Sequence, residues 1–203
     1  MTNFDNVWRN LRKYSRGVFK LPPPYRQVMP TPKIDSSEIT LPSRHTVEAL
    51  IANYYSYWHR QAPIVHWPTF TQQVDNVLAA GTFVGIAQIW AGLFFSVLAC
   101  GTLLPSEHAN LGLDSMKGME YIIISARLLN TWTDNQLADH ARTALLISTF
   151  MYELNIRSAG WVWLGTAVRM SQDVGLHLEN GPWQPHEAAA RKRLLWAIIA
   201  WDR

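Results

Sequence analysis

Cysteine is almost absent from this sequence of 203 residues, which contains Cys100 alone. A single thiol excludes an internal disulfide framework and any zinc site built on several thiolates. Charged residues are also scarce, at 16%, whereas apolar residues make up 48% of the chain. This composition is typical of a folded domain, and a chain of this length can bury a sizeable core without disulfides or metals.

Sequence signatures of catalysis are missing as well. The chain contains no GxGxxG fingerprint, no P-loop and no GxSxG nucleophile elbow. His186 and Glu187 begin a zincin HExxH motif, but Ala190 stands where its second histidine is needed. The seven histidines show no ligand spacing on a shared helix face, and Cys100 is expected to pack as a small hydrophobe. We therefore predict no enzyme, and no cofactor or metal held by this chain.

Positive charge is concentrated near the N-terminal end. Residues 1–44 hold eight Lys/Arg and three Asp/Glu, whereas residues 45–203 hold ten and twelve. If residues 6–20 were helical, five of these cations would share one face: Arg9, Arg12, Lys13, Arg16 and Lys20. They are the candidate contacts to nucleic acid phosphates, and a solvated arm is the alternative. No secretory signal and no Asn-x-Ser/Thr sequon is present, so we expect an intracellular protein.

Proline marks the boundary of the folded part. Six of the eleven prolines lie between Pro22 and Pro42, and proline is incompatible with helix interiors. We therefore divide the chain into a basic arm with a Pro-rich linker, residues 1–44, and a folded domain, residues 45–203.

The folded part shows helical periodicity throughout. The first stripe consists of Val47, Leu50, Ile51, Tyr54 and Trp58. A Thr69/Gln72 capping box predicts a second helix that stops at Gly81, and a Thr133/Gln136 capping box predicts the fifth helix, through about residue 151. Further helices are expected over residues 83–104, 115–130, 159–174 and from 185 to the end of the chain. With no alternating hairpin pattern, the prediction is an all-α bundle of about seven helices.

The run at 83–104 contains 22 residues without a charge, which is long enough to span a bilayer. It also contains Gln88 and three glycines, and no Lys or Arg lies close to either end. We favour a central buried helix, and a membrane-associated protein anchored by this run is an alternative.

Three segments carry a family resemblance. Residues 63–70 read PIVHWPTF, residues 163–177 read WLGTAVRMSQDVGLH, and residues 187–203 contain EAAARKRLLW and WDR. In this order they resemble the fungal-specific transcription factor domain, the middle homology region of zinc-cluster (Zn2Cys6) regulators. The signature positions, which we interpret as structural, are Pro63, His66, Pro68, Phe70, Arg169, Met170, Asp173, Gly175, His177, Trp196, Asp202 and Arg203.

The resemblance implies an all-α regulatory domain of a nuclear, DNA-binding transcription regulator. DNA and zinc would enter through a six-cysteine cluster that this chain, with one cysteine, cannot build. The family domain normally continues beyond the Asp-Arg pair, so the C-terminal end is expected to be truncated. Partners implied are DNA through a separate module, transcription machinery or coregulators, a dimer partner and a small-molecule effector, but no membrane. A helical protein with a Trp-lined ligand cavity and no transcriptional role is a second alternative.

The signature segments also support physical expectations. Arg169 and Asp173 are spaced to pair on one helix face, and Gly175 is suited to stop that helix. Gly160 and Gly165 would allow close approach of a neighbouring helix. The basic run at 191–193 is expected to be mostly solvated. The final apolar stripe is expected to be partly uncovered; it consists of Leu194, Leu195, Ile198 and Trp201.

Overall fold

The computed structural model describes residues 33–34, 39–104, 115–129, 136–178 and 185–202. Within these residues the chain forms seven α-helices and no strand, which confirms the all-α prediction. The helices are α2 (Arg44–Tyr54), α3 (Trp67–Ala80), α4 (Gln88–Gly101), α5 (Ser115–Leu128), α6 (Ala138–Glu153), α7 (Arg157–Asp173) and α8 (Pro185–Trp201). A π-helical turn, η2 (Tyr55–His59), continues α2.

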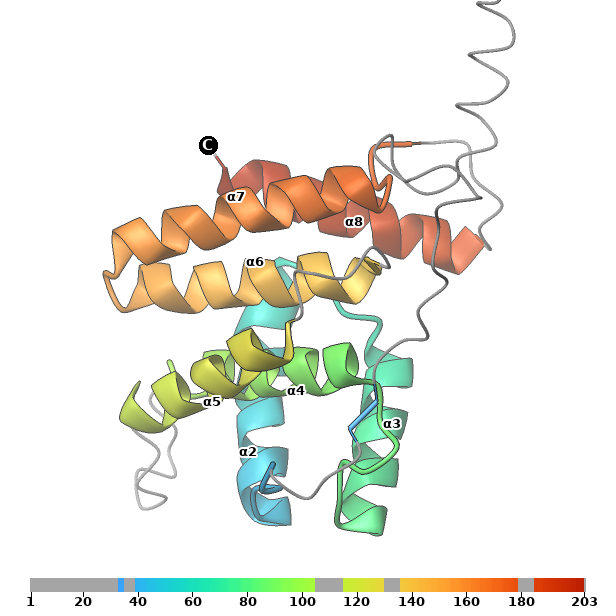
Figure 1. Ribbon diagram of the computed structural model, residues 1–203, viewed down its shortest axis with the longest axis vertical. Helices are drawn as coiled ribbons and strands as arrows, with labels where there is room; N and C mark the ends of the chain where they lie inside the picture. The colour runs from blue at the N-terminus through green and yellow to red at the C-terminus, as the bar shows by residue number, and fades with distance from the viewer. Residues whose placement is uncertain (1–32, 35–38, 105–114, 130–135, 179–184, 203) are drawn as a thin grey trace, which may run out of the picture.

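The helices are stacked in layers (Figure 1). α4 and α5 form a central pair, α6 lies on one side of it, and α7 and α8 lie beyond α6. On the opposite side, α2 and α3 run across the central pair. Helices that follow one another along the chain from α4 to α7 therefore run antiparallel, and α4 also packs directly on α6.

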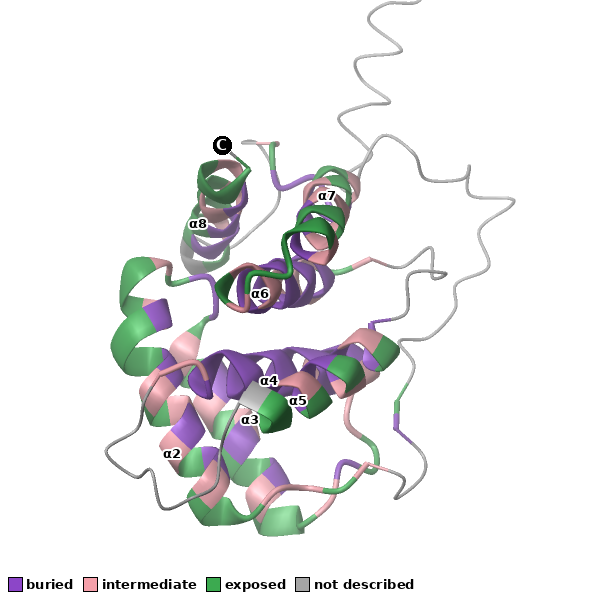
Figure 2. Ribbon diagram, turned by 90° about the vertical axis from the view of Figure 1, so that its left-hand side faces the viewer, coloured by how far each residue is buried: buried purple, intermediate pink, exposed green. Residues whose placement is uncertain are grey.

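α4 is the centre of the core (Figure 2). Every residue of α4 except Gln88 and Trp90 is buried. α5 is fixed against it, because the Ser125 hydroxyl donates to the Gly92 carbonyl at 2.8 Å. The prediction of a buried central helix is thus confirmed.

The apolar run is not helical along its whole length. Residues 83–87 form a turn before α4, and Gly85 adopts φ +80°, a left-handed conformation that suits glycine. The helix is therefore shorter than the 22 residues expected. No helix in the described part of the chain is both long and apolar enough to cross a membrane.

One capping prediction is wrong, and a second helix starts later than expected. α3 begins at Trp67 rather than Thr69, because Pro68 fits the first turn of a helix and lacks the N–H that would be unpaired there. α6 begins at Ala138, and the N–H of Leu137 before it donates to Nδ1 of His140 at 2.9 Å. The predicted cap at Thr133 lies outside the described residues. The stop at Gly81 is confirmed, with φ +68°.

α6 and α7 form a tight antiparallel pair. Asn155 makes the turn between them in a left-handed conformation, φ 59°. Gly160 lies against α6: a Cβ there would meet the Tyr152 ring at 3.0 Å, and the Ser148 hydroxyl donates to its carbonyl at 2.8 Å. The expectation that a neighbouring helix approaches closely is confirmed for Gly160. It is wrong for Gly165, where an added Cβ would meet only the Arg169 side chain of the same helix.

The apolar stripe of α8 is covered by neighbouring helices more completely than expected. Leu194 and Ile198 are fully buried because α8 packs on α6 and α7. Leu195 is half-buried, whereas Trp201 is 39% exposed. The uncovered part of the stripe is therefore confined to its end.

A short piece of the linker is attached to the helical body. The N–H of Ile34 donates to the Ile86 carbonyl at 2.9 Å, and the N–H of Gly85 donates to the Ile34 carbonyl at 2.7 Å. The Ile34 side chain is buried in the core cluster. We call this contact the linker anchor.

Candidate functional site

The first signature segment connects η2 to α3. Pro63, His66 and Pro68 are exposed, whereas Phe70 is buried in the core. Nδ1 of His66 lies within hydrogen-bond distance of the Thr69 hydroxyl, at 2.6 Å, and the structural role of this histidine stays a prediction. The segment thus exposes Pro63, His66 and Pro68, while Ile64, Val65 and Phe70 anchor it in the core.

The second signature segment forms the end of α7. Met170 is buried and Arg169 is exposed, and the Arg169 guanidinium donates to the Gly165 carbonyl at 3.1 Å. This bond directs the Arg169 side chain one turn back along the helix. The pairing of Arg169 with Asp173 stays a prediction. Gly175, at φ +72°, stops the helix as predicted. His177 beyond it is exposed.

The third signature segment is α8. Trp196 is 65% exposed and Asp202 is exposed, while Arg203 lies outside the described residues. Arg191 is 8% exposed and donates to the Val174 carbonyl at 2.8 Å. The expectation of a solvated basic run is therefore wrong at Arg191 and holds for the exposed Lys192 and Arg193.

A groove with a mixed polar and apolar lining joins the first and third segments. It encloses about 290 Å³ and is lined by His66 and Phe70 from one side and Glu187 of α8 from the other. An ion pair between Arg142 and Asp139 of α6, 2.5 Å long, lies in its wall. Nε of Arg142 also donates to the Ile64 carbonyl at 2.7 Å, so α6 fixes the position of the first segment.

A second, mostly apolar groove lies farther along α8, and we call it the α8 groove. It encloses about 410 Å³ between Tyr54 and Trp58, the link at 61–64, the face of α6 around Leu145, and α8. Pro63 and Trp196 line it, so two signature segments meet here.

The five candidate contacts to nucleic acid in the basic arm all lie outside the described residues. They are Arg9, Arg12, Lys13, Arg16 and Lys20.

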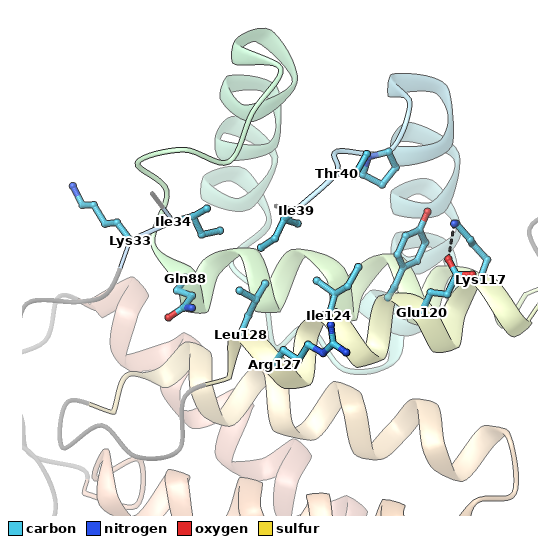
Figure 3. Close-up of a pocket in the computed structure, with 12 residues that line it drawn as sticks. Lys33, Ile34, Ile39, Thr40, Gln88, Lys117, Glu120, Ile124, Arg127 and Leu128 are labelled. Carbon is cyan, nitrogen blue, oxygen red and sulfur yellow. Dashed lines mark hydrogen bonds and ion pairs between the residues drawn. The ribbon is translucent and has the colours of Figure 1, made fainter. Parts of the chain in front are cut away.

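A wider hollow, of about 730 Å³, lies between the linker and the α4–α5 pair (Figure 3). Its cations do not converge: Lys33 and Arg127 lie apart in the view, and Nζ of Lys117 pairs with Glu120 at 2.6 Å. The arrangement is a mixed-charge surface under the linker and lacks the convergent donors that would hold an anion.

The described residues do not form a metal centre. No group of three or more His, Cys, Asp or Glu side chains among them is placed to hold an ion. Cys100 is fully buried, its thiol lies 3.6 Å from the Leu146 carbonyl, and burial raises its pKa far above the ordinary value. The zinc chemistry implied by the resemblance therefore does not fit these residues, and Cys100 is a packing residue, as predicted.

Sequence reasoning missed Arg142 and Arg191. Arg142 lies on α6 and Arg191 on α8, and their roles depend on the carbonyl groups of Ile64 and Val174, which are 78 and 17 positions away in the sequence. The one sequence signal that these arginines are not solvated is that each follows small apolar residues on its helix. That signal is weak.

Comparison with known proteins gives a consistent result. The model of the fungal specific transcription factor domain matches residues 51–203. A Zn(2)-C6 fungal-type transcription factor, mpsB of Macrophomina phaseolina, is 26% identical over 175 residues, which cover 79% of this chain and 23% of that protein. The lactose regulatory protein LAC9 of Kluyveromyces lactis is 23% identical over 172 residues, covering 83% of this chain and 18% of that protein. The chain thus spans less than a quarter of these curated relatives, and no solved structure matches it.

Proposed function

Since the chain belongs to the fungal-specific transcription factor domain family, we propose that it is the regulatory domain of a zinc-cluster-type regulator and controls transcription in the nucleus. It acts through contacts with the transcription machinery or coregulators. A separate module supplies zinc and sequence-specific DNA contacts, because the single cysteine here cannot build a six-cysteine cluster. Family members are transcription factors, which are generally not enzymes.

One structural observation supports this proposal. Three segments far apart in the sequence meet around α8: Pro63 and Trp196 line the same groove, and Arg191 of α8 donates to Val174 at the end of α7. The family signature is therefore a single packed unit. Such a unit can transmit a change at α8 to both the first link and α7, which is what a regulatory domain requires.

A reporter assay tests the proposal. The full chain is fused to an unrelated sequence-specific DNA-binding module and placed upstream of a reporter gene in a fungal cell. We expect expression that differs several-fold from that with the module alone, and nuclear location of a fluorescent fusion without any added localisation signal.

Two variants on α8 provide the matched control. Leu194→Asp buries a charge at a fully buried position and should return the reporter to the level of the module alone. Ala189→Asp places the same charge at an exposed position and should leave the effect intact. A fusion that occupies its DNA site, is folded and leaves the reporter unchanged would reject the proposal.

The α8 groove favours a second candidate, a helical ligand-binding protein without a transcriptional role. The two candidates differ in the same assay, because a protein that only binds a ligand leaves the reporter unchanged with or without that ligand.

A further inference from the structure

We propose that the α8 groove binds a flat aromatic small molecule with one anionic group. The groove encloses about 410 Å³. Small-molecule sites in proteins typically enclose about 300 to 1,000 Å³, with apolar walls and a few polar groups that fix orientation. The groove therefore has room for a ligand of two or three fused or linked rings.

The floor of the groove is rigid. Tyr54 is fully buried and stacks on Trp67, with ring centroids 6.1 Å apart and an interplanar angle of 12°. Nε1 of Trp58 donates to the Cys100 carbonyl at 3.1 Å, which fixes the indole against α4. Since these side chains are held before any ligand arrives, little conformational entropy is lost on binding.

The backbone beside the floor is unusual. Trp58 belongs to the π-helical turn η2, in which the chain is wider than an α-helix. Such turns are rare and occur frequently at functional sites, because they move a side chain out of helical register. Here the side chain so placed lines the groove.

The outer wall consists of aromatic faces and one charge. Trp196 is 65% exposed and Trp201 is 39% exposed, and both line the groove. Arg193, on the same helix, is the charged residue among the described residues that line it. Tryptophan faces favour stacking with a flat ring system, and a guanidinium favours an anionic group such as a carboxylate.

The positive charge of Arg193 also acts on His59, a residue of the π-helical turn η2. The pKa of His59 is lowered, first by burial and second by the positive charge of Arg193. Because Arg193 lines this end of the groove, a ligand anion would be placed there while the rings lie over the tryptophans.

This inference names an effector class for the regulatory domain, so its biological meaning rests on the proposed function. Binding itself is measured without any reporter. A chain that binds the probe but has no transcriptional effect rejects the proposed function alone, and a chain that alters transcription but does not bind rejects this site alone.

The test uses the full chain and two probes, 2-naphthoate and its neutral amide, 2-naphthamide. Equilibrium dialysis followed by absorbance measures the bound fraction. We expect saturable binding of one 2-naphthoate per chain and about fivefold weaker binding of the amide, which is the difference an exposed ion pair makes.

Two pairs of variants locate the site on α8. Ala200→Phe fills the mouth of the groove and should abolish saturable binding, whereas Ala189→Phe, at an exposed position outside it, should bind as the unaltered chain does. Arg193→Gln should weaken binding of naphthoate to the level of the amide and leave the amide unchanged, whereas Lys192→Gln should have no effect. Both replaced alanines are exposed, so these variants are expected to fold, and a thermal unfolding curve verifies this.

Three outcomes would overturn the proposal. The first is no saturable binding of naphthoate to the folded chain. The second is equal binding to Ala200→Phe and the unaltered chain. The third is a concentration-dependent dimer that Ala200→Phe dissociates while no probe binds, which would make the groove an interface between two copies of the chain.

Discussion

The guanidinium of Arg191 donates a 2.8 Å hydrogen bond to the carbonyl oxygen of Val174, across the junction between α7 and α8. The carbonyl belongs to the last turn of α7, where four carbonyl groups of a helix have no partner within the helix. A residue in a basic run thus serves as a cap for the preceding helix.

The first prediction follows from this bond. Arg191→Met keeps much of the side-chain volume but removes the donor, so we expect a loss of about 1 to 3 kcal/mol in the free energy of unfolding. Urea denaturation measures it. Lys192→Met, at the exposed neighbouring position, should change stability by no more than about 0.5 kcal/mol. Equal losses in both variants would show that the bond to Val174 contributes nothing specific.

The second prediction compares two glycines of α4. A Cβ at Gly101 would overlap the backbone carbonyl of Leu50 in α2, whereas a Cβ at Gly92 would make ordinary contacts of 3.4 Å and more. Gly101→Ala should therefore destabilise the protein by about 1 to 3 kcal/mol. Gly92→Ala should be neutral or stabilising by up to about 1 kcal/mol, because alanine favours helix more than glycine does. Thermal unfolding of the two variants checks the order, and a more stable Gly101→Ala would contradict the α2–α4 contact.

The third prediction concerns pH. Burial lowers the pKa of His140 below its ordinary value of about 6.5, and Nδ1 accepts a hydrogen bond from Leu137, which requires the unprotonated nitrogen. The unfolded chain therefore binds a proton at higher pH than the folded chain does. The stabilisation is complete above about pH 6.5 and is lost as the pH falls below that value.

A glutamine at this position separates titration from capping. Glutamine is favoured three residues after the cap because its side chain can accept the same N–H, and it does not titrate. His140→Gln should thus flatten the loss of stability between about pH 7 and pH 5 while remaining folded. Denaturation at several pH values measures the slope, and an unchanged slope would assign the effect to other groups.

The fourth prediction concerns DNA. Residues 45–203 carry two more acidic than basic residues, whereas the arm carries Arg9, Arg12, Lys13, Arg16 and Lys20. We expect weak binding that falls steeply with salt, is similar for unrelated duplexes and disappears when residues 1–21 are deleted. Titration of several duplexes at two salt concentrations tests this. A preference for one duplex that survives both high salt and the deletion would show that the helical body recognises DNA.

Much of the fold could be predicted because burial follows periodicity. Val47, Leu50, Tyr54 and Trp58 lie on one face of a continuous helical segment and are all buried. The helix ends at Gly81 and Gly175 were also correct, since the left-handed residue after a helix is most often glycine. Such signals are local, and the sequence contains them in full.

Helix starts were harder to predict. Thr69 has the side chain of a good cap, yet the helix begins at Trp67, because Pro68 has a φ of its own that suits the first turn and lacks the N–H that would be unpaired there. At α6 the bond to the Leu137 N–H comes from His140, a residue that is uncommon in this role. Several residues near each start could satisfy the free N–H groups, and the choice depends on packing.

The candidate site depended most on tertiary structure. The sequence supplied the tryptophans and the signature segments, but the α8 groove exists because η2, α6 and α8 meet. The positions of the half-buried Arg142 and the buried Arg191 likewise depend on carbonyl groups of Ile64 and Val174. No pattern within one helix predicts a partner in another.

The linker anchor has a mechanical consequence. Two backbone hydrogen bonds join Ile34 to Gly85 and Ile86, directly before the central helix α4. Tension along the preceding chain would therefore load the turn before α4 first and leave α2 shielded from it. Any module joined upstream would pull on a fixed point of the core instead of swivelling about the start of the bundle. The largest distance between such a module and the linker anchor would be set by the number of residues before Lys33, because an extended chain spans at most about 3.5 Å per residue.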